Sequence, residues 1–371
     1  MSDDILFENR NVGKMTALNR IMVAPMTRIS ASETGVPGER MEQYYARFAR
    51  GGFSTIITEG MYVDEEWSQT YAFQAGLVSP AQTEGWKNIT DKVHKNGGKI
   101  IAQLMHAGAI SQGNIYKKDT LAPSAVQPKG EQLSFYHGAG KYQLPREMEE
   151  KEILRVIGSF AEAAARAVND AGFDGVEIHG ANGYLLDQFF TDYTNQRTDR
   201  WGGDIAARLS LTLDVIAAVR ERLGPDVPVG VRISQGKVND FHHKWSEGVQ
   251  GATRVFSLLA ASGVDFIHIT EYNALMPAFE ESPLSLVQIA RQAAPDITII
   301  ANGSLSDGES AVLALNQGAD FVAIGKSALA NPDWPLRVRH SEGLRAFDKA
   351  ILAPAADVKD SELSLTLSAM R

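Results

Sequence analysis

Eight short runs rich in β-branched residues alternate with amphipathic stretches along the chain, and this alternation restricts the fold more than any other feature. Short strands separated by helical segments predict a parallel sheet with crossover helices. Eight units spread almost evenly over the sequence favour a closed sheet over an open one. We therefore predict an α/β fold, a (β/α)8 TIM barrel, with strands near residues 21–24, 54–58, 99–104, 175–178, 227–233, 265–269, 297–301 and 321–324.

Helical patterns fill the intervals between these strands. The clearest of them lie at residues 151–171, 207–222 and 306–317. Gly172, Gly263 and Gly318 each stand a few residues before a predicted strand, where a glycine commonly ends a helix.

Two intervals are too long for simple connections. Residues 105–150 follow the third strand and contain three prolines and several aromatic residues, and residues 234–245 follow the fifth strand. Long loops in a compact domain usually carry function or structure of their own, and both follow strand carboxyl ends, where a barrel builds its active site. Because no linker or repeat of fixed period interrupts the sequence, we expect residues 1–371 to form a single domain with a capping insertion at 105–150.

The composition excludes several classes of function. The net charge is -9 and no basic block occurs, so neither nucleic acid nor an anionic membrane is expected as a partner. The chain has no cysteine, which excludes disulfides, thiolate catalysis and cysteine-ligated iron–sulfur clusters. The first ten residues are acidic and contain no apolar signal segment, and no run is long enough to span a bilayer. A cytoplasmic protein is expected, as a monomer or a homo-oligomer.

Polar and glycine residues gather where the predicted strands end. Gly303 and Gly325 follow the last two strands, where barrels commonly bind phosphate, and Lys326 adds a positive charge. Arg232 ends a buried strand and needs an acceptor-rich ligand or a carboxylate such as Glu59. These groups predict a bound nucleotide-like cofactor, and the whole set comprises Ala24, Pro25, Met26, Thr27, Glu59, Gly60, Gln103, His179, Arg232, Asn302, Gly303, Gly325 and Lys326.

The stretch F-D-G-V-E-I-H-G-A-N-G-Y at 173–184 combines a buried strand with a glycine-bent polar loop. His179 and Asn182 can both donate hydrogen bonds to one oxygen, and Tyr184 can supply a proton. Such groups can polarise a carbonyl and protonate an enolate. A lone histidine at a strand end is more often structural, so the remaining motifs decide between the two interpretations.

Several motifs in barrel order resemble the Old Yellow Enzyme family of FMN-dependent ene-reductases, and the resemblance covers nearly the whole chain. Besides residues 173–185, the motifs are A-P-M-T-R (24–28), R-G-G-F-S-T-I-I-T-E-G (50–60), Q-L-M-H-A-G (103–108), N-Q-R-T-D-R-W-G-G (195–203) and V-R-I-S (231–234).

The resemblance implies a role for each residue. Around the FMN ring, the Thr27 hydroxyl would hydrogen-bond a flavin carbonyl, Gly60 would leave room, and Gln103 and Arg232 would face the pyrimidine edge. Ala24, Pro25 and Met26 would line the ring, and Asn302, Gly303, Gly325 and Lys326 would lie at the phosphate end. His179 and Asn182 would hold the substrate carbonyl. Tyr184 would protonate the α-carbon, after NADPH or NADH had reduced FMN and hydride had passed to the β-carbon of an α,β-unsaturated carbonyl or nitro compound.

Two residues depart from the family pattern. Lys326 stands where many relatives carry arginine, and it provides a point charge without the bidentate fork. Met105 stands where tryptophan is common, so its flexible side chain is expected to reshape the substrate pocket. Tyr272, after the sixth strand, either reaches the substrate or only caps the barrel.

Two other functions remain open. A barrel lyase or isomerase could use the same phosphate loops without flavin, although the only strand-end lysine is Lys326. A non-catalytic flavin-binding protein would not need His179, Asn182 and Tyr184 together. The adjacent His242 and His243 lack further residues at ligand spacing, so no metal site is expected.

Overall fold

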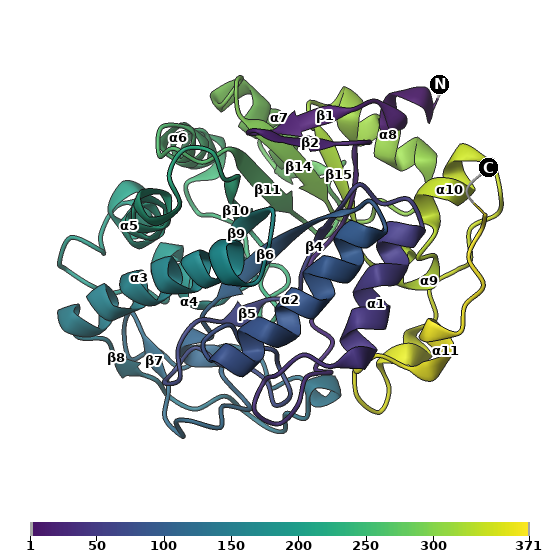
Figure 1. Ribbon diagram of the computed structural model, residues 1–371. Helices are drawn as coiled ribbons and strands as arrows, with labels where there is room; N and C mark the ends of the chain where they lie inside the picture. Colours follow the sequence, from purple (N-terminus) through teal and green to yellow (C-terminus); the bar gives the residue numbers. More distant parts are fainter. Residues whose placement is uncertain (1–2, 370–371) are drawn as a thin grey trace.

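The computed structural model describes residues 3–369, and its centre is a closed barrel of parallel strands (Figure 1). Neighbouring strands pair in the order β4-β3-β15-β14-β11-β10-β9-β6, and β6 also pairs with β4. The predicted (β/α)8 barrel is therefore confirmed, with every strand within two residues of its expected ends. The strands are β3 (Ile21–Val23), β4 (Thr55–Ile57), β6 (Lys99–Met105), β9 (Gly175–His179), β10 (Val229–Ser234), β11 (Phe266–Thr270), β14 (Thr298–Asn302) and β15 (Phe321–Ile324).

Helices connect the strands and surround the barrel (Figure 1). The three predicted helices are confirmed as α3, α5 and α8, and α3 continues into a π-helical turn over Arg166–Asp170. Within residues 3–369, no helix combines the length and the apolarity needed to cross a bilayer. The helices are α1 (Glu39–Arg50), α2 (Pro80–Lys95), α3 (Glu150–Ala165), α4 (Leu185–Phe190), α5 (Ile205–Leu223), α6 (Gly248–Ala260), α7 (Leu286–Ala293), α8 (Gly308–Asn316), α9 (Lys326–Ala330), α10 (Trp334–Arg339) and α11 (Asp360–Leu363).

Alternate strand residues form two separate cores. In β14, Ile300 packs inside the barrel, whereas Ile299 belongs to the core between the strands and the helices. The Phe266 ring packs directly against the backbone of Gly230. A Cβ atom at this position would lie 2.2 Å from the ring, so a residue with a side chain would clash. The inner core comprises Val12, Met15, Ala17, Met22, Ala24, Ile57, Ile101, Phe266, Ile300, Phe321 and Ala323.

An antiparallel hairpin that the sequence analysis did not predict packs against this inner core. It is formed by β1 (Arg10–Val12) and β2 (Met15–Ala17), and Val12, Met15 and Ala17 bury their side chains against the interior strand residues. In Figure 1 the hairpin lies at the opposite end of the molecule from β7 (Leu121–Ala122) and β8 (Arg146–Glu147). One end of the barrel is thereby covered, which leaves the carboxyl ends of the strands for the site.

The insertion at residues 105–150 has structure of its own, as expected. It contains the paired strands β7 and β8 and two short 3-10 helices. The remaining short elements are η1 (Asp3–Phe7), η2 (Gly108–Ile110), η3 (Ser134–Tyr136), η5 (Lys349–Leu352), β5 (Met61–Tyr62), β12 (Pro277–Phe279) and β13 (Ser282–Ser285).

A Gly-x-Asp sequence precedes three of the strands and ties each one to its neighbour. Gly263 has φ +89°, and two residues later Asp265 donates from its backbone N to Val229 O (2.7 Å). The carboxylate of Asp265 accepts in return from Val229 N (2.9 Å) and from Arg220 Nη2 (2.6 Å). Asp174 and Asp320 bind Ile100 and Ile299 in the same manner. The left-handed glycines expected after the helices are confirmed at Gly172, Gly263 and Gly318.

The Asp265→Ala substitution should lower the free energy of unfolding by about 1–3 kcal/mol, because Val229 N and the Arg220 guanidinium lose a partly buried acceptor. Urea denaturation followed by circular dichroism measures this change. Asp226→Ala is the control, since Asp226 pairs with Lys14 at the surface, where both side chains are about 70% exposed, and should change little. Equal effects of the two substitutions would contradict the role of Asp265.

Candidate active site

A cavity of about 840 Å³ lies among the loops that follow β3, β10, β11, β14 and β15. Its volume falls within the range of about 300–1,000 Å³ that is usual for small-molecule sites. Most residues predicted to bind the cofactor line it, whereas Thr27, Gly60 and Gln103 lie outside its lining. The predicted residues in the lining are Ala24, Pro25, Met26, Asn182, Arg232, Tyr272, Asn302, Gly303, Gly325 and Lys326.

Arg232 lies in this lining with its guanidinium only partly satisfied. Its Nη2 atom donates to Asn302 Oδ1 (2.9 Å), and its buried Nε atom has no hydrogen-bond partner within residues 3–369. The suggested pairing with Glu59 is wrong. The carboxylate of Glu59 instead accepts from Tyr45 OH (2.8 Å), on α1. Arg232 therefore retains an unused donor beside the cavity.

A buried polar network supports this region from within the barrel. Glu177 accepts from Gln103 Nε2 (2.8 Å) through one carboxylate oxygen, and its other oxygen bonds His268 Nδ1 (2.8 Å). All three side chains are buried. Gln103 is predicted from the sequence to face a ligand, but its amide nitrogen already donates to Glu177. Glu177 and His268 were missed, although both occupy inward positions of predicted strands.

The end of the cavity beside β14 and β15 combines tight backbone turns with one unpaired cation. Gly303 has φ +136°, and a Cβ atom there would lie 2.1 Å from Glu271 O, so only glycine fits. Lys326 is exposed and has no acidic partner within residues 3–369. Asn302, in contrast, uses Oδ1 to accept from Arg232 and Thr270, and its Nδ2 atom donates to Ala323 O. Asn302 orients Arg232 and has little capacity left for a ligand.

Gly60 and Met105 lie against one another. A Cβ atom on Gly60 would come within 2.0 Å of Met105 Sδ and 3.2 Å of Gln103 Oε1. The space that Gly60 leaves is therefore filled by the Met105 thioether. Met105 is buried and packs with Tyr71 and Tyr184 in a small apolar cluster.

His179 ends β9 as a neutral imidazole. Burial, together with the nearby positive charge of Arg232, lowers its pKa well below the usual 6.5. Its Nδ1 atom accepts a hydrogen bond from Ala181 N (3.3 Å), so the single ring proton lies on Nε2. No partner for Nε2 occurs within residues 3–369, and this atom is free to donate to a ligand.

Tyr184 lies beside His179, with ring centroids 4.9 Å apart. Its hydroxyl hydrogen-bonds Tyr71 OH (2.7 Å). Burial raises the pKa of Tyr184 to about 12, although the hydrogen bond with Tyr71 acts in the opposite direction. Tyr184 is therefore protonated at neutral pH and can act as an acid.

Three tyrosines that the sequence did not indicate, Tyr71, Tyr136 and Tyr142, pack in one apolar cluster with Tyr184. The rings of Tyr71 and Tyr136 lie 4.4 Å apart, and Tyr136 OH donates to Thr27 O (3.2 Å). Tyr136 and Tyr142 come from the insertion at 105–150, whose aromatic content was the only available signal. The insertion thus supplies side chains to the wall beside Tyr184.

The loop after β3 is fixed by a buried ion pair with the far end of the chain. Arg28 donates to both carboxylate oxygens of Glu362, at 2.7 and 2.6 Å, and both side chains are almost fully buried. Burial opposes ionisation of Glu362, but the hydrogen bonds and charge of Arg28, together with the Lys359 backbone N–H and the charge of Arg47, lower its pKa. The next residue, Ile29, has φ +38°, a strained value for a β-branched residue. Arg28 and its partners hold this strained loop beside Thr27.

Tyr272 lies at the rim of the cavity with 89% of its surface exposed. Phe241, from the loop after β10, also lines the cavity and is 71% exposed. Both roles considered for Tyr272 therefore stay predictions.

Comparison with known proteins gives consistent results. Residues 5–344 match the model of the NADH:flavin oxidoreductase / NADH oxidase family. The chain is 34% identical to a probable flavin mononucleotide-dependent alkene reductase of Leishmania infantum, over 94% of each chain. It superposes on the old yellow enzyme homologue from Zymomonas mobilis with a TM-score of 0.88 at 31% identity, covering 98% of this chain and 99% of that one. A structure of morphinone reductase in complex with tetrahydroNAD matches with a TM-score of 0.82, also at 31% identity, over 94% and 93% of the two chains.

The buried carboxyl of Glu59 gives a test of the electrostatics around the site. Burial raises its pKa from 4.5 to about 7. The unfolded chain therefore ionises before the folded chain does, and the stability that Glu59 contributes is lost as the pH rises from about 4.5 through 7. As the pH rises over this range, the native protein should therefore lose about 3 kcal/mol of unfolding free energy relative to the Glu59→Gln variant.

Urea denaturation at a series of pH values between 4.5 and 8 measures this difference. Glu131→Gln, at an exposed position, is the matched control and should give a difference that does not vary with pH. A pH-independent difference for Glu59→Gln as well would contradict the raised pKa.

Proposed function

The chain belongs to the NADH:flavin oxidoreductase / NADH oxidase family, and we propose that His179, Asn182 and Tyr184 act on its substrate while the cavity residues hold FMN. The resemblance to the Old Yellow Enzyme family is confirmed by the family match and by the relatives. The chain is an FMN-dependent oxidoreductase that takes hydride from a nicotinamide and reduces activated carbon–carbon double bonds. A lyase or isomerase without flavin and a non-catalytic flavin-binding protein are not favoured.

The donors around the cavity fit FMN. The buried Nε atom of Arg232 has no partner, Lys326 has no acidic neighbour, and the Thr27 hydroxyl makes no hydrogen bond within residues 3–369. Unsatisfied donors of this kind suit a ligand with one anionic end and several carbonyl acceptors, as in FMN. The observed donor set therefore supports the cofactor that the family implies.

The cofactor would be held from both ends of the cavity. Lys326, with the backbone at Gly303 and Gly325, would bind its phosphate, and Asn302 would keep Arg232 oriented toward the ring. Thr27 and Arg232 would bind ring acceptors, and Gln103 could contribute through Oε1, since its amide nitrogen is committed to Glu177. Ala24, Pro25 and Met26 line the cavity beside β3 and would contact the ring.

When bound, FMN would supply the hydride chemistry, which carries a hydride from NADH or NADPH to the β-carbon of the alkene. His179 donates from Nε2 to the substrate carbonyl oxygen, and the Asn182 amide donates to the same oxygen. Donors held in place in this way stabilise the negative charge that develops on that oxygen. Because His179 is neutral and Asn182 does not titrate, this binding should not depend on pH between about 6 and 8.

Tyr184 supplies the proton that the α-carbon gains. Tyr71 can donate a hydrogen bond to the Tyr184 oxygen as this proton leaves, which stabilises the resulting phenolate. The adjacency of neutral His179 to the Tyr184–Tyr71 pair is the observation on which this proposal depends. It places a donor for an oxygen and an acid for a carbon side by side.

We propose four further points that the sequence suggests. The substrate is a small activated alkene, either a carbonyl or a nitro compound, and no nucleic acid or membrane is a partner. Residues 1–371 form a single FMN-binding domain. The acidic composition without cysteine supports a cytoplasmic location.

Tyr184→Phe tests the acid role. The FMN-loaded variant should still be reduced by NADPH, but its reoxidation by cyclohexenone should slow by roughly 10²–10³, the usual contribution of a general acid. Stopped-flow absorbance under nitrogen separates the two half-reactions. Tyr116→Phe, which also removes a tyrosine hydroxyl that bonds another tyrosine, is the control and should leave both rates unchanged. An unchanged reoxidation rate in Tyr184→Phe would exclude the acid role.

Lys326→Ala tests the phosphate end of the cavity. Loss of this cation should raise the Kd for FMN by about tenfold, and Lys326→Arg should retain or improve the affinity because its fork can bind two phosphate oxygens. Titration of the cofactor-free protein with FMN, followed by flavin fluorescence, gives the Kd. Lys349→Ala removes another exposed lysine and should have no effect. The assignment fails if the two alanine variants bind FMN equally well.

A further inference from the structure

The peptide that carries Asn182 has an unusual backbone. Asn182 has φ +62° and Gly183 has φ +87°, so two consecutive residues are left-handed. This region is costly for a residue with a side chain, and it persists only where the surroundings fix it. All four backbone polar atoms of the two residues are hydrogen-bonded, and the partners come from two separate segments.

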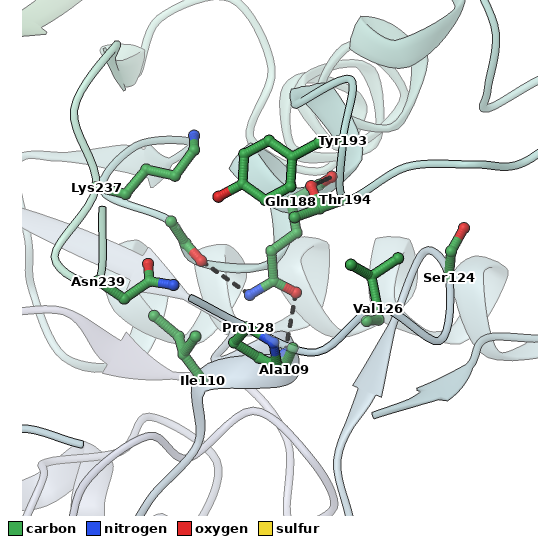
Figure 2. A pocket seen from close by; sticks show the side chains of 12 residues that line it. Ala109, Ile110, Ser124, Val126, Pro128, Gln188, Tyr193, Thr194, Lys237 and Asn239 are labelled. Atoms are coloured by element: carbon green, nitrogen blue, oxygen red, sulfur yellow. Dashed lines mark hydrogen bonds between the residues drawn. The ribbon is translucent and has the colours of Figure 1, made fainter. Parts of the chain in front are cut away.

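The first segment is α4, which follows the peptide directly. Gly183 N donates to Asp187 Oδ2 (2.6 Å), and Gly183 O accepts from Gln188 Nε2 (2.8 Å). The same amide accepts through Oε1 from Ala109 N (2.9 Å), and Figure 2 shows this hydrogen bond between Gln188 and Ala109. Asp187 is fully buried, so its carboxylate needs a partner of opposite charge.

The second segment is the insertion after β10, residues 234–245. Ser234 Oγ accepts from Asn182 N (2.8 Å), and Val238 N donates to Asn182 O (3.0 Å). Lys237 lies between them and donates from Nζ to Asp187 Oδ2 (2.8 Å), the same oxygen that Gly183 N binds. The Lys237 side chain is only 2% exposed.

Lys237 reaches Asp187 beside a small cavity of about 20 Å³ at the back of the peptide. Figure 2 shows Lys237 and Asn239 on one side of this cavity and Val126 and Ser124 on the other. Neither His179 nor Tyr184 lines it. Lys237 also lines the large cavity, but its Nζ atom is committed to Asp187, which lines neither cavity, so the ammonium group acts on a side chain that supports the Asn182 peptide.

We propose that Lys237 is a positioning residue: its buried ion pair with Asp187 locks the insertion at 234–245 onto the Asn182–Gly183 peptide and so aims the Asn182 amide at the substrate oxygen. This inference rests on the proposed function of Asn182. Without the ammonium, the buried Asp187 carboxylate lacks its counter-charge and is drawn toward water, away from Gly183 N. The Asn182 backbone can then leave the left-handed region, and the Asn182 amide is no longer held in one orientation toward the substrate oxygen.

Binding of 4-hydroxybenzaldehyde to the FMN-loaded protein tests the proposal without turnover, since a phenolate oxygen mimics that of the enolate. Lys237→Met should bind it about tenfold more weakly, as expected for one hydrogen bond that is no longer held, and should keep the native Kd for FMN. The KM for cyclohexenone should rise more than kcat falls. Ser234→Ala, which removes the acceptor of Asn182 N, should act in the same direction.

A neutral pair provides the rescue. In the double variant that combines Lys237→Met with Asp187→Asn, the introduced amide carbonyl can accept from Gly183 N without a counter-charge. Affinity for the phenol should therefore return to within about threefold of the native value. Arg220→Met breaks another ion pair, at the opposite end of the barrel, and is the control for a loss of stability alone. It should leave phenol affinity unchanged.

The outcomes separate this inference from the proposed function. Native-like phenol affinity in both Lys237→Met and Ser234→Ala overturns the inference, and Ser234→Ala decides alone if Lys237→Met does not fold. If Asn182→Ala weakens phenol binding and the positioning variants do not, only the inference fails. If Asn182→Ala itself binds the phenol as tightly as the native protein, the proposed role of Asn182 fails.

Discussion

The barrel can keep a polar layer in its interior because one carboxylate, Glu177, makes hydrogen bonds with side chains from two other strands. It joins Gln103 on β6 to His268 on β11, and all three are removed from water. A buried charge is tolerated only when such partners surround it. Arg232, on the strand between β9 and β11, adds positive charge to the same layer. This hydrogen-bonded layer therefore supports the residues at the strand ends even when no ligand is bound.

The barrel could be predicted because its physics is local. Each strand is a short β-branched run, and each is followed by a helix whose apolar face covers it. The two cores then follow from the alternation of side chains, as with Ile299 and Ile300. The cavity residues at the strand ends could be predicted for the same reason, because all parallel strands end at one face of a barrel. The β1–β2 hairpin was missed because its strands, R-N-V and M-T-A, lack the β-branched runs that mark the barrel strands.

The contacts that were missed or wrong depend on directions that the sequence does not encode. Glu59 and Arg232 both lie near the carboxyl ends of strands, but Glu59 bonds Tyr45 on α1 while Arg232 lines the cavity. Tyr71 and Tyr136 meet only because two loops cross over the site. Asn302 was expected to bind the cofactor, and its side chain is instead consumed by Arg232, Thr270 and Ala323. The neighbour that each of these side chains contacts is determined by tertiary packing and not by the local sequence.

The Arg28–Glu362 pair joins residues 334 positions apart, and this separation has a consequence for synthesis. A chain emerging from the ribosome can pair β3 with β4 early, but the loop beside Thr27 has no counter-ion for its arginine until Glu362 has been translated. Until then the strained backbone at Ile29 lacks the contacts that hold it. The ion pair that fixes this loop can therefore form only after nearly the whole polypeptide has been synthesised.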